Sequence, residues 1–156
     1  MLIRIILMCC MLGQLCGCDI LRLGNDQHVD TQSRLDSNRK MWDSQMASNY
    51  RFNFQWSCYC TMDFVAEVNI SVRENRIHGA VLVEGNLPIP LDAAIERYKV
   101  MDGLFDLLQS AIDENAHTIT ARYHPELGYP TEVWIDYEQN SVDEELGFSI
   151  HNLVLE

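Results

Sequence analysis

The feature that most constrains the fold is an alternation of large apolar and polar side chains between residues 50 and 60. Every second position is aromatic or cysteine, and most positions between them are polar. A period of two residues is typical of a strand that buries one face. The pattern therefore predicts a strand whose buried face carries Tyr50, Phe52, Phe54, Trp56, Cys58 and Cys60.

Further alternations predict five more strands. Apolar residues alternate over 64–72 and return over 77–83, and the turn Arg73-Glu74-Asn75-Arg76 lies between them. Asn75 tolerates the left-handed backbone that a tight hairpin needs. Residues 85–90 are expected to form a loop, because Pro88 and Pro90 cannot donate to a sheet ladder. The remaining strands are expected over 119–123, 133–137 and 148–152, with a turn at Gly128-Tyr129-Pro130.

Two segments have helical spacing. Trp42, Met46 and Tyr50 lie four residues apart, which predicts a short helix with Asp36, Ser37 or Asn38 as its cap. A stronger amphipathic pattern covers 101–112, and residues 92–99 are expected to form a separate helical turn before it. Sequential strands with short connections pair antiparallel. We therefore expect an α+β fold with two helices on one face of an antiparallel sheet of about six strands, in the order αβββαβββ.

The N-terminus has the pattern of a signal peptide. Arg4 precedes an apolar stretch over 5–12, which is too short for the roughly 20 residues of a membrane-spanning helix. The ending Leu15-Cys16-Gly17-Cys18 resembles the lipobox of bacterial lipoproteins, which implies that Cys18 becomes an acylated N-terminus. Several acyl chains on one residue give stable membrane anchoring. We expect a leader over 1–17, a lipidated, flexible polar tether over 18–37 and one domain over 38–156, in the envelope and facing the periplasm.

Cys58 and Cys60 are the cysteines that remain once the leader and the acylated cysteine are set aside. On an ideal strand their Cβ atoms would be roughly 6.5 Å apart, whereas a disulfide needs about 3.5–4.5 Å. The pair closes only if the chain bulges or turns at Tyr59. A strained disulfide or two buried thiols is the favoured interpretation, and a soft-metal site and a redox pair are the alternatives.

The charge balance excludes some classes of partner. Eleven Lys and Arg against 23 Asp and Glu give a net charge of −12, and no basic cluster occurs. Nucleic-acid binding and a polybasic membrane contact are therefore not expected. No nucleophile elbow, phosphate loop or metalloprotease motif occurs in the chain, and no cofactor is expected.

Two groups of side chains remain as surface candidates. Trp134 lies between Glu132 and Asp136 on the outward side of a predicted strand. Burial of this side chain beneath a loop or helix is the favoured interpretation, and a contact surface formed by the three residues is the alternative. The acidic run Asp136, Glu138, Asp143, Glu144 and Glu145 is a weak candidate for Ca²⁺. It lacks the EF-hand spacing, so a solvated acidic loop is favoured.

Several motifs follow one another in an order that resembles a known family. They are Trp56-Ser57-Cys58-Tyr59-Cys60, a Val-rich hairpin, Leu104-Phe105, Gly128-Tyr129-Pro130, Val133-Trp134-Ile135-Asp136 and Asp143-Glu144. Over about residues 38–156 this order resembles the bacterial lipoprotein family called domain of unknown function 6174. Asn75 stands where that family usually has Gly, and His124 where it tends to have Asp. The resemblance implies a fold and an envelope setting, and it implies no activity.

Three functional hypotheses follow. The favoured one is a tethered binding or assembly module without catalytic activity, whose acidic, aromatic face contacts another envelope protein or a periplasmic ligand. The second is a metal-binding or thiol-redox protein that uses Cys58 and Cys60. The third is an enzyme with an unmarked carboxylate site, which would require a concave pocket lined by perturbed acids.

Overall fold

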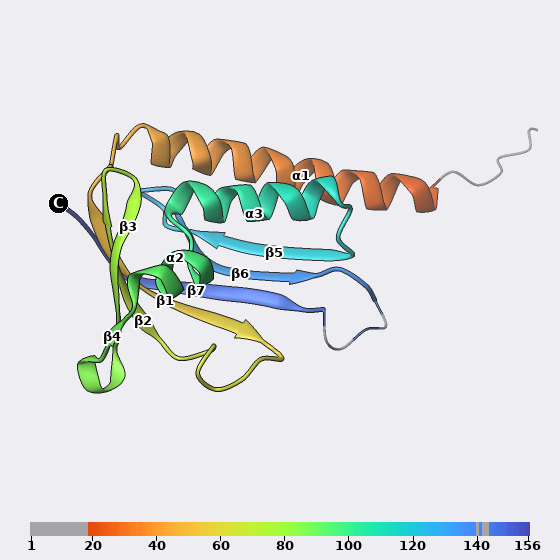
Figure 1. The fold of residues 1–156 in the computed structure, drawn as a ribbon. Coiled ribbons are helices and arrows are strands. Elements are labelled where there is room, and N and C mark those ends of the chain that lie inside the picture. Colours follow the sequence, from red (N-terminus) through yellow and green to blue (C-terminus); the bar gives the residue numbers. More distant parts are fainter. Residues whose placement is uncertain (1–18, 140, 142–143) are drawn as a thin grey trace, which may run out of the picture.

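The computed structural model describes residues 19–139, 141 and 144–156, and their side chains from residue 29 onward. In this part of the chain the strands form one antiparallel sheet of seven, and the α-helices lie on one of its faces (Figure 1). The helices are α1 (Asp19–Asp43), the short 3₁₀ helix η1 (Glu84–Asn86), α2 (Leu91–Arg97) and α3 (Met101–Asp113). The strands are β1 (Tyr50–Cys58), β2 (Val68–Arg73), β3 (Arg76–Leu82), β4 (Pro88–Ile89), β5 (Thr118–Tyr123), β6 (Pro130–Asp136) and β7 (Leu146–Leu155).

The predicted α+β class is confirmed, with one strand more than expected. Pro88 and Ile89 form β4 and pair with β3, where the sequence predicts a loop. Pro88 does not prevent this pairing, because β4 is an edge strand. The backbone N–H that proline lacks is not needed on the open side of such a strand. The separate helical turn predicted over 92–99 is α2, and the amphipathic segment after it is α3.

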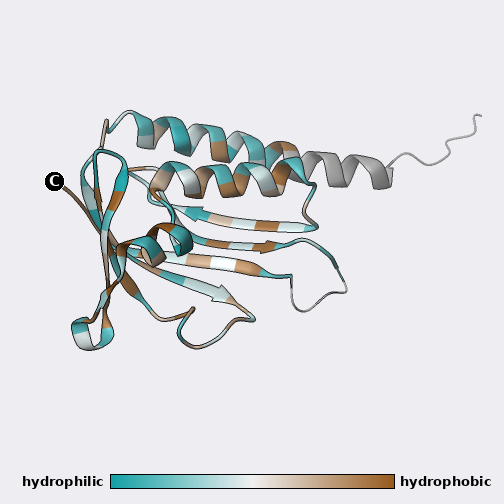
Figure 2. Ribbon diagram, in the orientation of Figure 1, coloured by the Kyte–Doolittle hydropathy of each residue, from teal (hydrophilic) through white to brown (hydrophobic). Residues whose placement is uncertain are grey.

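Strand β1 lies at the centre of the sheet, whose order is β4-β3-β2-β1-β7-β6-β5. Its alternation has the predicted effect: Tyr50, Phe52, Phe54 and Trp56 are all buried. They pack beneath the helices against the buried side chains of α3, which include Leu104. Along α3 hydrophobic residues alternate with hydrophilic ones (Figure 2), as expected of an amphipathic helix with one face on the core.

Helix α1 begins much earlier than predicted. The sequence predicts a flexible tether over 18–37 and a helix that includes Trp42, Met46 and Tyr50, but the helix runs from Asp19 to Asp43. Met46 is exposed after the helix, and Tyr50 begins β1. Among the side chains of α1 from residue 29 onward, the buried apolar ones are Leu35 and Trp42, two turns apart, so the core begins before residue 38. The predicted caps 36–38 lie inside the helix.

Helix α1 is held against α3 by polar contacts, which explains why its hydrophobic periodicity is weak. The side chains of Gln32 and Gln109 exchange hydrogen bonds of 2.9 Å. Arg39 forms an ion pair of 2.8 Å with Asp106 and lies over the Phe105 ring. No helix within the described residues is long and apolar enough to span a membrane.

The β2–β3 hairpin has the predicted turn. Arg73 pairs with Arg76, and the two residues between them, Glu74 and Asn75, have φ angles of 50° and 57°. Positive φ at both positions is the signature of a type I′ turn. Strand β2 begins only at Val68, so the predicted alternation over 64–66 belongs to the preceding loop.

The turn before β6 is docked on α1. Gly128 has a φ of 78°, and the backbone of α1 lies so close that a Cβ atom here would collide with the Asn38 carbonyl oxygen. Tyr129 is buried and contacts the Trp42 ring edge to face. His124 Nδ1 accepts the backbone N–H groups of the next turn, at residues 126 and 127, and thereby holds it closed.

Candidate functional site

The face of the sheet opposite the helices is polar. Because alternate residues of β1 face the core, Arg51, Asn53, Gln55 and Ser57 lie on this outer face. The flanking strands contribute their own outward residues, so the outer face combines side chains that lie far apart in the sequence.

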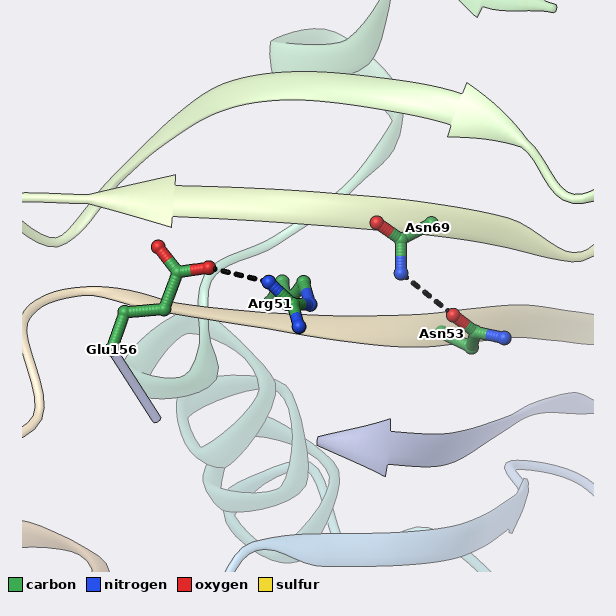
Figure 3. A network of polar contacts seen from close by, with 4 residues as sticks. All are labelled: Arg51, Asn53, Asn69 and Glu156. Carbon is green, nitrogen blue, oxygen red and sulfur yellow. Dashed lines mark hydrogen bonds and ion pairs between the residues drawn. The ribbon is translucent and has the colours of Figure 1, made fainter. Parts of the chain in front are cut away.

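Over β1 and β2 these polar side chains bond to one another. Asn69 donates to the Asn53 side chain over 2.7 Å, and Asn53 donates to Glu67 over 2.9 Å. Arg51 pairs with Glu156 at 2.8 Å (Figure 3). Their hydrogen-bonding capacity is thus largely used within the protein.

Trp134 is the large apolar side chain that β6 exposes on this face. Its side chain is 37% exposed to solvent, and the residue pairs with Gly147 of β7. A Cβ atom at Gly147 would lie 2.7 Å from the indole Cε3, so the indole rests on the bare backbone of β7. Glycine here supports the ring from below while leaving it open to solvent. The expectation that Trp134 is buried beneath a loop or helix is therefore wrong, and the alternative of an exposed side chain holds.

A shallow groove of about 520 Å³ surrounds Trp134. Arg122 and Glu132 line it and form a cross-strand ion pair of 2.7 Å. Both are mostly exposed, so the pair contributes little to stability and either partner is available to a ligand. The full lining is Ser57, Arg122, Thr131, Glu132, Val133, Trp134, Phe148, Ser149 and His151.

Several polar side chains of this groove have no intramolecular hydrogen bond within the described part of the chain. They are the hydroxyls of Ser57, Thr131 and Ser149, the imidazole of His151 and the indole N–H of Trp134. This half of the outer face thus differs from the β1–β2 half. Its donors and acceptors are directed to solvent around an exposed aromatic ring, an arrangement typical of a binding surface.

The structure brings together only part of the predicted contact surface. Glu132 and Trp134 line the groove, whereas Asp136, at the end of β6, does not. Its Oδ1 accepts the backbone N–H of Glu138 at 3.1 Å. No sequence motif points to the other polar residues of the groove, which are Ser57, Arg122, Thr131, Ser149 and His151. Their outward positions follow from alternation, but their proximity to Trp134 depends on β7 lying between β1 and β6.

Cys58 and Cys60 form a disulfide. Strand β1 ends at Cys58 and the chain turns at Tyr59, which brings the two Cα atoms to 5.2 Å. The predicted requirement for closure, a bulge or turn at Tyr59, is therefore met. The expectation that both cysteines are buried is wrong: Cys58 is half-buried, and Cys60 is exposed because it follows the end of the strand.

The acidic candidates that the structure describes do not form a metal site on their own. Within the described residues no group of three or more His, Cys, Asp or Glu side chains is arranged to hold a metal ion. Asp136, Glu138 and Glu144 are therefore not assembled into one, and Asp143 lies outside the described residues. Cys18, the predicted lipidation site, also lies outside them.

Comparison with known proteins gives one match. The model of a family described as "Family of unknown function (DUF6174)" matches residues 34–155. Its first residue lies within α1, immediately before the buried Leu35. No curated protein and no solved structure matches the chain.

Proposed function

Because the chain belongs to the DUF6174 family, whose function is unknown, we propose from its own residues that it is a lipid-anchored binding module of the bacterial envelope, without catalytic activity. It presents the groove around Trp134 to another envelope protein.

The observation that carries this proposal is the supported, exposed indole among unpaired polar groups. Tryptophan and arginine are enriched among the residues that dominate binding energy at protein interfaces. Trp134 supplies apolar surface at the centre of the groove, and Arg122 and Glu132 supply charges of both signs beside it. The strand backbone that carries these side chains is already ordered by the sheet, so binding costs little backbone conformational entropy.

The proposed anchor is compatible with the position of α1. Acylation of Cys18 would place the lipid immediately before Asp19, where the helix begins. At 1.5 Å per residue the 25 residues of α1 span about 37 Å, and its first turns extend past the end of α3 (Figure 1). A helical stem of this kind would hold the domain away from the bilayer in place of the predicted flexible tether.

The proposal is tested by site-specific crosslinking in the native envelope. A photoreactive amino acid at Thr120, which is exposed and pairs with Trp134, should give one dominant crosslinked partner. The Trp134→Ala variant should lose most of that product. Tyr59→Ala removes an aromatic ring that is 87% exposed but outside the groove, and it should leave the product unchanged. Equal yields from both variants would contradict the assignment of the groove.

Thiol exchange is a second candidate, favoured by the exposure of Cys60. A thiolate of an external dithiol would attack the Cys60 sulfur, release the Cys58 thiolate and then close its own disulfide, leaving two protein thiols. Reduction must also precede any soft-metal binding, because the thiolate is the metal ligand. Alkylation and mass spectrometry after equilibration with dithiol buffers would test this. A pair that stays oxidised across buffers that reduce ordinary exposed disulfides would exclude exchange.

A further inference from the structure

A second groove lies on the helix side of the molecule, where the start of β3 meets the link between α2 and α3. Its volume is about 410 Å³, within the range of roughly 300–1,000 Å³ that is typical of small-molecule sites. Ile77 of β3, Ile95 of α2, and Tyr98 and Val100 of the link line it with aliphatic and aromatic carbon. It shares no lining residue with the groove around Trp134.

Part of this apolar surface is open to solvent. Ile95 is 57% exposed, and Leu91, one turn earlier on α2, is exposed on the same side of the helix. The hydroxyl of Tyr98 is buried beside the groove and has no hydrogen-bond partner within the described residues. Apolar side chains that remain exposed around a hollow are typical of a ligand or partner site.

The charged residues of the groove are both cationic. Arg76 and Lys99 line it and are exposed, and neither forms an ion pair within the described part of the chain. In a chain of net charge −12 with only 11 Lys and Arg, two unpaired cations beside one apolar groove give it a local charge opposite to that of the whole molecule. A ligand suited to this groove is apolar along its length and anionic at one end.

We propose that this groove binds a single-chain anionic amphiphile, with the acyl chain against Ile77, Ile95, Tyr98 and Val100 and a carboxylate head paired with Arg76 or Lys99. An acyl chain suits the lining better than a peptide does. A peptide would bring backbone N–H and C=O groups against aliphatic carbon, and each group left without a partner there costs free energy. Methylene groups carry no such cost, and their burial is favourable in proportion to area.

The test uses the purified full chain in nanodiscs of zwitterionic phosphatidylcholine and a dodecanoic acid that carries a photoreactive diazirine at its methyl end. After irradiation, peptide mapping should place the adducts on the segments that contain Ile77 and residues 95–100. Excess dodecanoate should suppress them, whereas dodecyltrimethylammonium, which has the same chain and a cationic head, should not. Because mapping reports the position of each adduct, probe that partitions into the bilayer does not mimic binding.

The matched variants separate charge from nonspecific apolar contact. Arg76→Gln combined with Lys99→Gln should lower the adduct yield about tenfold, since pairing with a charged group strengthens binding by about that factor. Arg73→Gln removes an exposed cation of the same hairpin that does not line the groove, and it should label like the unmodified chain. Adducts spread evenly over exposed apolar side chains, equal competition by the cationic amphiphile, or full labelling of the double variant would each overturn the proposal.

Discussion

At the scale of single residues, the hydroxyl of Tyr50 links the sheet to a helix. It accepts the backbone N–H of Met101 at 2.9 Å, and both residues are buried. Met101 is the first residue of α3, and Val100, at the N-cap position, makes no capping hydrogen bond with its side chain. The first N–H groups of a helix have no partner within it. A strand residue 51 positions earlier therefore does the work of a helix cap.

Tyr50→Phe should lower the free energy of unfolding by about 1–3 kcal/mol, because it leaves the Met101 N–H buried without an acceptor. Urea unfolding followed by tryptophan fluorescence would measure the loss. Tyr59→Phe, at an exposed tyrosine, should change it by less than about 0.5 kcal/mol. If the two variants unfolded at the same urea concentration, the proposed cap would make no net contribution.

The pKa of the Tyr50 hydroxyl predicts how the free energy of unfolding changes at alkaline pH. The pKa of Tyr50 is raised to about 12, because the effect of burial, to which nearby Asp102 adds, outweighs the bond from Met101, which lowers the pKa. In the unfolded chain the hydroxyl ionises near pH 10, so between pH 10 and 12 the folded state holds more protons. The free energy of unfolding should therefore be constant below pH 10 on this account and fall as pH rises toward 12.

Urea titrations at a series of pH values would show this decline. Tyr123 contributes to it in the unmodified chain, since its pKa is also raised to about 12 by burial, an effect that Arg34 only partly offsets. Tyr50→Phe should consequently flatten the decline without abolishing it. A decline of unchanged slope in that variant would show that Tyr50 is not the group that titrates.

At the scale of elements, α1 belongs to the domain because it contacts both α3 and the β5–β6 turn. The Gly128-Tyr129-Pro130 motif makes the second contact: the glycine allows close approach, and the tyrosine packs on Trp42. The turn motif at 128–130 and helix α1 therefore pack together, although they lie far apart in the sequence. The same turn is closed by His124, whose ring nitrogen accepts the N–H bonds that an Asp carboxylate would also accept.

Gly128→Ala should destabilise the domain by about 1–3 kcal/mol, since a Cβ is strained at positive φ and would push α1 away. Gly79→Ala is the matched control, because nothing lies within 4 Å of its added Cβ and its φ is not positive. That variant should be neutral or slightly stabilising. Thermal unfolding of both variants would distinguish a loss at α1 from a general cost of replacing glycine.

At the scale of the whole molecule, the sheet combines two meanders. The first, β1-β2-β3, runs from the centre toward the β4 edge, and the second, β5-β6-β7, runs from the opposite edge back to the centre. The first and last long strands, β1 and β7, are therefore neighbours at the centre. Both edges are protected: β4 is short and begins with Pro88, and Arg34 of α1 donates to the Ala121 carbonyl of β5 at 2.9 Å. Such protection discourages association through sheet edges, so the side-chain surfaces are the more suitable contact sites.

The anchor is tested on the whole chain. In a bacterial host fed an alkyne fatty acid, the unmodified protein should carry the label and Cys18→Ser should lose it completely, since Cys18 is the proposed acylation site. Cys16→Ser changes the neighbouring cysteine within the leader and should stay labelled. Label retained by Cys18→Ser, or lost from both variants, would contradict acylation at that residue.

Features that depend on neighbours along the chain could be predicted from the amino-acid sequence. The alternation over 50–58, the type I′ turn at Glu74-Asn75 and the amphipathic α3 follow from backbone geometry and side-chain periodicity within a few residues. Which distant elements meet is seen only in the folded chain. The position of β7 beside β1 places Ser57 near Trp134, and polar contacts with α3 place α1 in the domain. Periodicity specifies which face of an element is buried, whereas its neighbours are selected by packing and hydrogen bonds between residues that no local pattern relates.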